Sequence, residues 1–207
     1  NSKTIFCNEN GYYAIYDSDR YGFNNPDKEW DRKDKLEFVF VGDSFTQGAC
    51  VNVEDDIPGN IRKFLKENNR NPGVLNFGFR GQGPLGEYAL LREYLSELKT
   101  KRVVLIYFEN DLGNLLDEYR QKFLLKYLND TNYKQDLILK NEEKDKFIRS
   151  IVKKHLENLD KYQGSIFEER LKKLIKLQNV RKLFINTQPQ VTNEYVDLLK
   201  KTKSLIE

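Results

Sequence analysis

The sequence lacks several features that would place a protein in a class at once. It has no apolar run near the length needed to span a bilayer, no internal repeat and no low-complexity linker. It also has no methionine, and it opens at Asn1 without a hydrophobic signal segment. These absences argue against a membrane-spanning or repeat protein. The start at Asn1 without a methionine indicates a processed N-terminus. A removed signal or anchor segment would fit a location in the cell envelope or periplasm, which we expect in preference to the cytoplasm.

The sequence also lacks an excess of either charge. Its 35 lysines and arginines face 32 acidic residues, which leaves a net charge of +3. We expect these charges to be mixed over the surface, and a nucleic-acid partner is not implied. The only two cysteines, Cys7 and Cys50, are too few to indicate a redox compartment. They can pair or stay free, and we expect two unpaired thiols.

The chain has the length and apolar content of one domain. Its 207 residues are 39% hydrophobic, which is enough for one sizeable core. We predict a single domain over 1–207, with an N-terminal extension at 1–35, a core at 36–116 and a helical region at 117–207. The sequence stops at Glu207 inside a helical pattern, so we expect that the domain continues beyond it.

Three short apolar runs in the first half predict buried strands. They are Leu36–Val41, Val74–Phe77 and Val103–Phe108. Helical patterns that begin near Pro58 and at Pro84 fill the two gaps. Their apolar faces are carried by Ile61, Phe64 and Leu65 in the first, and by Leu85, Tyr88, Leu91 and Leu95 in the second. This alternation predicts an α/β fold with a parallel sheet and right-handed crossovers.

The second half of the chain carries helical patterns almost throughout. They cover Leu112–Leu128, Glu142–Leu159, Ser165–Leu177 and Thr192–Ile206. The run Leu183–Ile185 fits either a short strand or the continuation of a helix. Three strands make a small sheet for this length, since about five or six is usual. Either the helices form a large cap, or further strands lie outside the sequence.

Glycines and polar residues follow each predicted strand directly. Ser44 follows the first strand, Gly81 lies beyond the second, and Asn110 follows the third. Because the carboxyl ends of parallel strands share one edge of a sheet, we expect these residues to be neighbours. A serine hydroxyl attacks an acyl carbon when a base accepts its proton, and the oxyanion that forms needs donors already in place. The backbone N–H groups of Ser44 and Gly81 and the side-chain amide of Asn110 are candidate donors.

Each of these residues also has a purely structural interpretation. Asp43 and Ser44 belong to the types favoured as helix caps. Gly81 suits a turn, and Asn110 with Asp111 can cap the helix that follows. The strand-end position and the flanking glycines favour a functional role for Ser44, and Asn110 gains support only from the other two strand ends. Three side chains near the same edge are interpreted as exposed loop residues: Gln47, Arg80 and Glu109.

The stretch from Gly42 to Gly48, Gly-Asp-Ser-Phe-Thr-Gln-Gly, resembles the first signature block of the GDSL-like, or SGNH, hydrolases. The likeness extends over about Tyr16 to Leu116, with three blocks in order at three strand ends. It implies a flavodoxin-like three-layer α/β/α sandwich. It also implies that Ser44 is the nucleophile and that Gly81 and Asn110 are oxyanion donors. Asp43 and Asp111 then occupy supporting positions.

The sequence departs from the family pattern in its last block. That block is an Asp-x-x-His motif, which supplies the general base and its orienting carboxylate, and no such motif occurs here. The only histidine, His155, follows Val152 by three residues inside a charged helical pattern, and we interpret it as a surface residue. The family's block follows its last strand, which agrees with the expectation that the sequence stops before it.

Two functions from different classes follow from these observations. The first is a serine ester hydrolase or acyltransferase that forms an acyl-serine on a lipid ester, a thioester or an acetylated carbohydrate, with no cofactor or metal expected. The second is a non-catalytic binding module that keeps the same sheet edge and lacks the base. A phosphate-binding α/β protein is disfavoured, because the first loop lacks the Gly-Lys-Ser/Thr ending of a P-loop.

Overall fold

The computed structural model describes residues 3–6, 11, 13–159 and 191–207. The chain divides into two compact units, Asn1–Ile138 with Val191–Glu207, and Leu139–Gln190. The first unit contains the sheet and the three strand ends. In the second, the described part is the helix α6 (Asn141–Leu159), which confirms the helix predicted there. None of the described helices is long and apolar enough to cross a bilayer.

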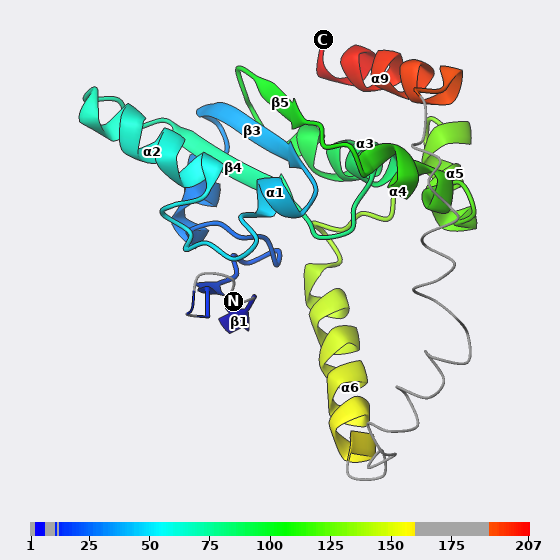
Figure 1. Cartoon of the computed structure of the whole chain (residues 1–207), viewed down its shortest axis with the longest axis horizontal. Coiled ribbons are helices and arrows are strands. Elements are labelled where there is room, and N and C mark those ends of the chain that lie inside the picture. The colour runs from blue at the N-terminus through cyan, green and yellow to red at the C-terminus, as the bar shows by residue number, and fades with distance from the viewer. Residues whose placement is uncertain (1–2, 7–10, 12, 160–190) are drawn as a thin grey trace. The chain divides into compact units, whose positions relative to one another are not determined.

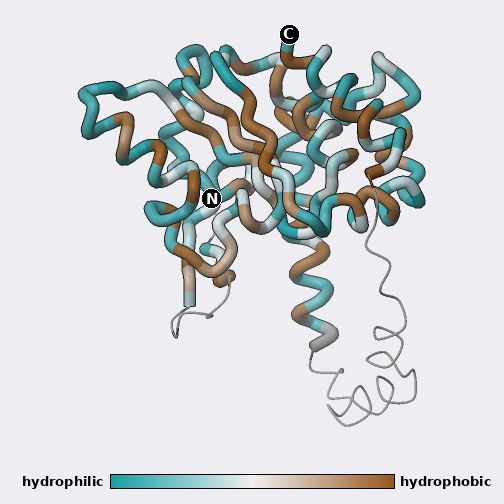
Figure 2. The backbone as a smooth tube through the Cα atoms, turned by 45° about the horizontal axis from the view of Figure 1, so that its top comes forward, coloured by the Kyte–Doolittle hydropathy of each residue, from teal (hydrophilic) through white to brown (hydrophobic). Residues whose placement is uncertain are grey.

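A three-stranded parallel sheet forms the centre of the first unit (Figure 1). The strand β3 (Leu36–Gly42) lies between β4 (Gly73–Gly78) and β5 (Val103–Ile106), so all three predicted strands are confirmed. The third ends at Ile106, two residues earlier than predicted. Hydrophobic residues are concentrated along these strands (Figure 2). The strands β3 and β4 are buried, as predicted, whereas the prediction of a buried strand is wrong for β5, which lies at an edge of the sheet with Leu105 exposed. The fold is α/β, as predicted.

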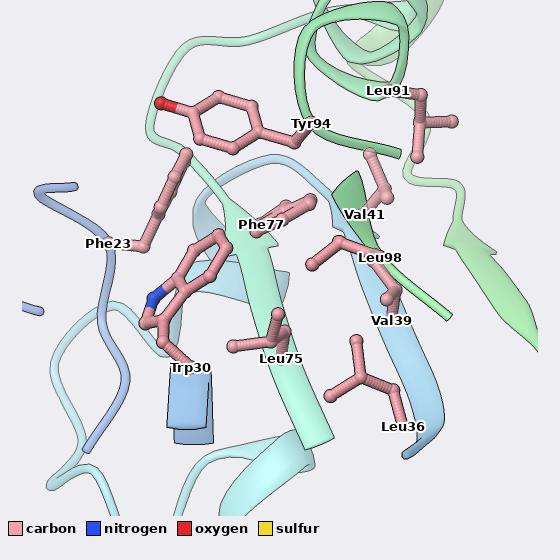
Figure 3. Close-up of a cluster of buried hydrophobic side chains, with 10 residues drawn as sticks. All are labelled: Phe23, Trp30, Leu36, Val39, Val41, Leu75, Phe77, Leu91, Tyr94 and Leu98. Atoms are coloured by element: carbon pink, nitrogen blue, oxygen red, sulfur yellow. The ribbon is translucent and has the colours of Figure 1, made fainter. Parts of the chain in front are cut away.

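Helices cover both faces of the sheet, which gives three layers. On one face, α3 (Pro84–Tyr94), the short 3-10 helix η2 (Leu95–Glu97) and the 3-10 helix η1 (Asp27–Arg32) flank an aromatic cluster. The rings of Trp30 and Phe23 lie 5.8 and 4.9 Å from that of Phe77, between centroids (Figure 3). Tyr94 of α3 closes this cluster from above, 5.3 Å from Phe77. The core of the unit is densest here.

The opposite face is covered by α2 (Ile57–Glu67). Asp56 caps this helix through a hydrogen bond from Gly59 N, and Leu65 packs against Phe40 and Val74. The prediction that Phe64 shares the buried face is wrong, since 59% of this side chain is exposed. The face of α2 that contacts the sheet is a narrow stripe of side chains along the helix, and Leu65 and Ile61 occupy this stripe.

The helices after β5 differ from the prediction in one respect. The single helix expected over 112–128 is instead α4 (Asp111–Glu118) and α5 (Lys122–Asn129), separated by a turn. This break allows Leu115 and Leu124 to pack in the same buried cluster. The last helix, α9 (Asn193–Ile206), is confirmed, and its Leu198 joins that cluster. The predictions at 165–177 and 183–185 lie outside the described residues.

The N-terminal extension contains a small antiparallel pair that the sequence did not reveal, β1 (Lys3–Ile5) and β2 (Ile15–Asp17). Cys50 is disulfide-bonded, so the prediction of free thiols is wrong at this residue. Cys7 lies outside the described residues. The sequence alone could not predict a disulfide at Cys50, because a disulfide forms only where the fold brings two cysteines within bonding distance.

Side chains from the extension and from α2 complete the outer edge of β4. Val74 N donates to Glu29 Oε2 at 3.0 Å, and Val74 O accepts from Arg62 Nη2 at 3.0 Å. Asn25 bonds both backbone groups of Asn76, N at 2.7 Å and O at 3.0 Å. Because an unpaired backbone group is costly when buried, these side chains replace a neighbouring strand. The outer edge of β4 is therefore closed by these side chains.

Replacing Asn25 with alanine tests this edge. Asn25→Ala leaves Asn76 N and O without partners in a buried site, so we expect the unfolding free energy to fall by roughly 2 to 4 kcal/mol. Urea denaturation measures the change. The control is Asn132→Ala, since Asn132 is exposed. Equal midpoints for Asn25→Ala and the control would show that the edge does not depend on this side chain.

Candidate functional site

The three strand ends lie level with one another at one edge of the sheet. Gly42 of the central strand is in register with Gly78 of β4 and with Ile106 of β5. Each strand therefore delivers the segment that follows it to the same edge. Ser44 comes two residues after Gly42, and the loops that carry Gly81 and Asn110 start on either side. The predicted juxtaposition of the three segments agrees with this topology.

Contacts between the segments hold them together. The Phe45 ring packs against the Phe108 ring at 4.1 Å between centroids, which joins the segments after β3 and β5. Arg80 N donates to Gln47 Oε1 at 2.9 Å, which joins the segments after β3 and β4. These contacts make one continuous rim, here defined as residues 43–48, 79–83 and 107–111.

Ser44 is the first residue of a single helical turn, α1 (Ser44–Gln47). Asp43 precedes it as the N-cap, and its Oδ1 accepts from Phe45 N at 2.9 Å. The helix cap that was one interpretation of this pair is thus present, and Asp43 supplies it. Ser44 is half-buried, and its hydroxyl makes no hydrogen bond to any described residue. The capping role of Asp43 leaves the Ser44 hydroxyl available.

The turn α1 lies directly on the end of β4. A Cβ at Gly78 would meet Gln47 N at 2.1 Å, so only glycine allows this approach. Asn76 fixes the turn from below, with its Nδ2 bonded to Thr46 O at 2.8 Å and its Oδ1 to Gly78 N at 2.8 Å. Sequence reasoning missed Asn76, although a polar residue inside an apolar strand signals a buried partner.

Gln47 also differs from its prediction. It was interpreted as an exposed loop residue, but it is buried, and its Nε2 donates to Tyr16 Oη at 3.3 Å. Both ends of its amide are therefore bonded, since Oε1 accepts from Arg80 N. Arg80 and Glu109 are exposed, as expected. Gln47 belongs to the support of the rim, because it connects α1 to two other segments.

Gly81 adopts a left-handed conformation, with φ of +76°. A Cβ built there would meet no atom within 4 Å, so the backbone conformation, and not lack of space, favours glycine. The turn is closed by a bond from Gln82 N to Phe79 O at 3.1 Å. This geometry agrees with the interpretation of Gly81 as a turn residue. It also leaves the Gly81 N–H without an acceptor among the described residues.

Asn110 and Asp111 have separate roles at the start of α4. Asn110 occupies the N-cap position, yet its side chain makes no capping bond. Asp111 lies inside the first turn, buried, and its Oδ2 accepts from Phe108 N at 2.7 Å. The side-chain amide of Asn110 therefore does not cap α4. Among the described residues, that amide has no hydrogen-bond partner.

The only histidine of the sequence, His155, lies on α6 in the second unit, where its side chain is exposed. This agrees with the surface interpretation. The described residues contain no group of three or more histidine, cysteine, aspartate or glutamate side chains arranged to hold a metal ion. Within the described residues, the rim thus presents hydrogen-bond donors and a serine hydroxyl, and it presents no base bonded to that hydroxyl.

Buried carboxyl groups lie behind the rim. Glu118 accepts from the backbone N–H groups of Gly83, Leu85 and Gly86 at 2.8, 3.0 and 3.1 Å, which caps the start of α3. Glu87, one turn into α3, is 6% exposed, and its Oε1 has no partner among the described residues. The sequence did not reveal this arrangement, because both residues read as ordinary charges of a helical pattern.

These carboxyl groups hold their protons unusually tightly. Burial, together with the charges of Asp111, Glu118 and Asp43, raises the pKa of Glu87 well above its ordinary value. Burial also raises the pKa of Asp111 to about 6. Several acids share one poorly solvated region, and protonation of some of them removes the repulsion. Glu87 therefore keeps its proton to higher pH than an exposed glutamate does.

The sequence matches no protein-family model and no curated protein. Among solved structures, it is similar to AlinE4, an SGNH-hydrolase family esterase, with 18% identity and a TM-score of 0.34, over 48% of this chain and 56% of that one. Two mutants of the same esterase match with 17% and 14% identity and TM-scores of 0.33 and 0.32. This chain thus spans about half the length of these neighbours. Similarity at this level assigns no family and no activity.

The raised pKa of Glu87 predicts how stability changes with pH. The unfolded chain releases this proton near the ordinary glutamate pKa, whereas the folded chain retains it to higher pH. The unfolding free energy should therefore fall as pH rises from the ordinary glutamate range toward neutrality. In Glu87→Gln we expect a smaller fall, measured by urea denaturation at several pH values. Exposed Glu109→Gln is the control, and an unchanged fall in Glu87→Gln would contradict the assignment.

Proposed function

We propose that this protein is a serine ester hydrolase or acyltransferase of the SGNH type, with Ser44 as the nucleophile. The substrate class we propose is an ester of a lipid, a thioester or an acetylated carbohydrate. Gly81 and Asn110 would bind the oxyanion, and Asp43 and Asp111 would support the two segments that present Ser44 and Asn110.

One observation carries the proposal. The rim donors that have no hydrogen-bond acceptor among the described residues include Ser44 N, Gly81 N and the Asn110 side-chain amide, and also Gln82 Nε2. The neighbouring donors Phe45 N, Arg80 N and Phe108 N are all bonded to side chains. Ser44 N, Gly81 N and the Asn110 amide belong to the three segments that begin at the same edge of the sheet, and the half-buried Ser44 hydroxyl lies on one of these segments. Preset donors of this kind are what an acyl oxyanion requires.

The chemistry would proceed through a covalent acyl-serine. Ser44 Oγ attacks the acyl carbon and gives up its proton, while the carbonyl oxygen becomes an oxyanion that the three donors stabilise. Collapse of this intermediate expels the alcohol or thiol, which takes up a proton. Water or a second hydroxyl then receives the acyl group. Each oxyanion donor in such a site contributes about 3 to 4 kcal/mol to transition-state binding.

The hydroxyl proton of Ser44 needs an acceptor if Ser44 is to react. This requirement distinguishes the two candidate functions, an ester hydrolase and a binding module. For the hydrolase we propose a histidine as the base, as the resemblance to the SGNH hydrolases implies, and this sequence contains no Asp-x-x-His motif that would supply it. The alternative is a binding module that holds an ester or another acceptor group on the same donors without reacting. The absence of a described hydrogen bond to Ser44 Oγ is what favours the alternative.

We also propose a location in the cell envelope or periplasm. The disulfide at Cys50 supports it, because disulfides form and persist mainly in oxidising compartments.

A fluorophosphonate probe tests the nucleophile. We expect the full-length protein to be labelled at one residue, and labelling to disappear in Ser44→Ala. The control is Ser204→Ala, since Ser204 is exposed on α9, and it should be labelled like the wild type. Intact-mass analysis measures the adduct. A full-length, folded protein that takes up no probe would favour the binding module.

The second test concerns the oxyanion donor. Asn110→Ala should lower kcat/KM on an activated ester by about 100- to 1,000-fold, because one donor is lost from the transition state. The fold should not change, since the Asn110 side chain makes no hydrogen bond to a described residue. Asn129→Ala, at the exposed end of α5, is the matched control and should keep full activity. Equal activity of the two variants would remove Asn110 from the site.

A further inference from the structure

A groove lined by cations lies beside α2, on the side of the first unit that carries the segment leading into β4. Its volume is about 830 Å³. Contributions come from η1, from α2 and from residues 69–72, which precede β4. Six of the lining residues are cations: Lys28, Arg32, Arg62, Lys63, Lys66 and Arg70. The sequence predicted charges mixed over the surface, and this concentration differs from that expectation.

The positive charge of the groove is cancelled only in part, since Arg32 pairs with Glu29 at 2.8 Å and Lys63 pairs with Asp55 at 3.2 Å. Only two carboxylates line it, Glu29 and Glu54, so six cations face two acids. Two further carboxylates outside the lining, Asp55 and Glu37, pair with Lys63 and Arg70. Arg70 is paired with Glu37 at 2.8 Å, but Glu37 also binds Lys101 and Arg102, so three cations share one carboxylate. A concave surface with this imbalance concentrates the positive potential.

Three cations of the groove, Lys28, Lys66 and Arg62, make no ion pair with a described residue. Lys28 and Lys66 are exposed, and neither has an ion pair among the described residues. Arg62 is fixed at the wall by bonds to neutral oxygens, Asn25 Oδ1 at 2.8 Å and Val74 O at 3.0 Å. These bonds orient the guanidinium, on which the carboxylates of Asp56, Glu29 and Asp19 also act electrostatically. The groove therefore combines a fixed cation with two mobile ones.

The composition of the lining selects among anionic ligands. None of its residues is aromatic, so neither nucleobases nor sugar rings have a surface for stacking. Ammonium groups are compact point charges, which bind phosphate without requiring a planar partner. The charges line a hollow and not a flat patch, which suits a chain better than a membrane surface. These features together favour a flexible chain of phosphate groups.

We propose that this groove binds a linear, flexible phosphate polymer through Lys28, Lys66 and Arg62. The site is separate from the rim, since none of its lining residues belongs to the rim. Binding there does not require a working nucleophile. The proposal therefore stands or falls independently of the proposed function.

Binding of fluorescently labelled inorganic polyphosphate, measured by anisotropy over a range of salt concentrations, tests the groove. We compare the wild type with Lys28→Glu/Lys66→Glu and with the control Lys122→Glu/Lys203→Glu, which changes the net charge equally at exposed sites of α5 and α9. At about 50 mM salt, the groove variant should bind at least about tenfold more weakly, and its salt-dependence slope should fall by roughly 2. The control should stay within about twofold of the wild type.

Three outcomes would overturn the proposal. The first is a wild type that does not bind polyphosphate at low salt. The second is an equal loss of binding in the control, which would indicate a response to net charge alone. The third is tighter binding of duplex DNA, heparin or anionic phospholipid vesicles than of polyphosphate. Thermal melting of both variants verifies folding, and Lys28→Gln/Lys66→Gln provides a milder groove variant.

Discussion

The parallel pairing of β3 with both of its neighbours is the constraint on which the rest of this structure depends. It sets Gly42, Gly78 and Ile106 level at one edge of the sheet, so that every segment after a strand begins at the same place. Parallel pairing requires long crossovers, and α2 and α3 supply them on opposite faces. The layers, the core and the rim are therefore consequences of one strand arrangement.

Buried polar groups hold that arrangement in place. On the outer edge of β4, Asn25 and Glu29 substitute for a strand. Under the rim, Asn76 bonds the turn that carries Ser44. Glu118 caps α3, and Glu87 is buried beside it with a raised pKa. A buried polar group without a hydrogen-bond partner lowers the stability of the fold. The rim therefore rests on a region in which burial disfavours the charged form of the groups that it contains.

The sequence predicted what depends on local patterns, and it could not predict what depends on tertiary contacts. Apolar runs located all three strands of the parallel sheet, and helical patterns located α6 and α9. The sequence did not predict the break between α4 and α5. No glycine or proline marks this break, and only the packing of the two helices requires it. Ser44, Gly81 and Asn110 were placed at one edge from strand order alone. Gln47 and Asn76 were missed, since their partners lie about 30 residues away.

The most direct measurement of the central claim is a crystal structure of the adduct with a phosphonate ester. Such an adduct places a phosphoryl oxygen where the acyl oxyanion would form. We expect phosphorus on Ser44 Oγ, with that oxygen about 2.7 to 3.1 Å from Ser44 N, Gly81 N and Asn110 Nδ2. An adduct on another residue, or a phosphoryl oxygen bonded to none of these donors, would contradict the account.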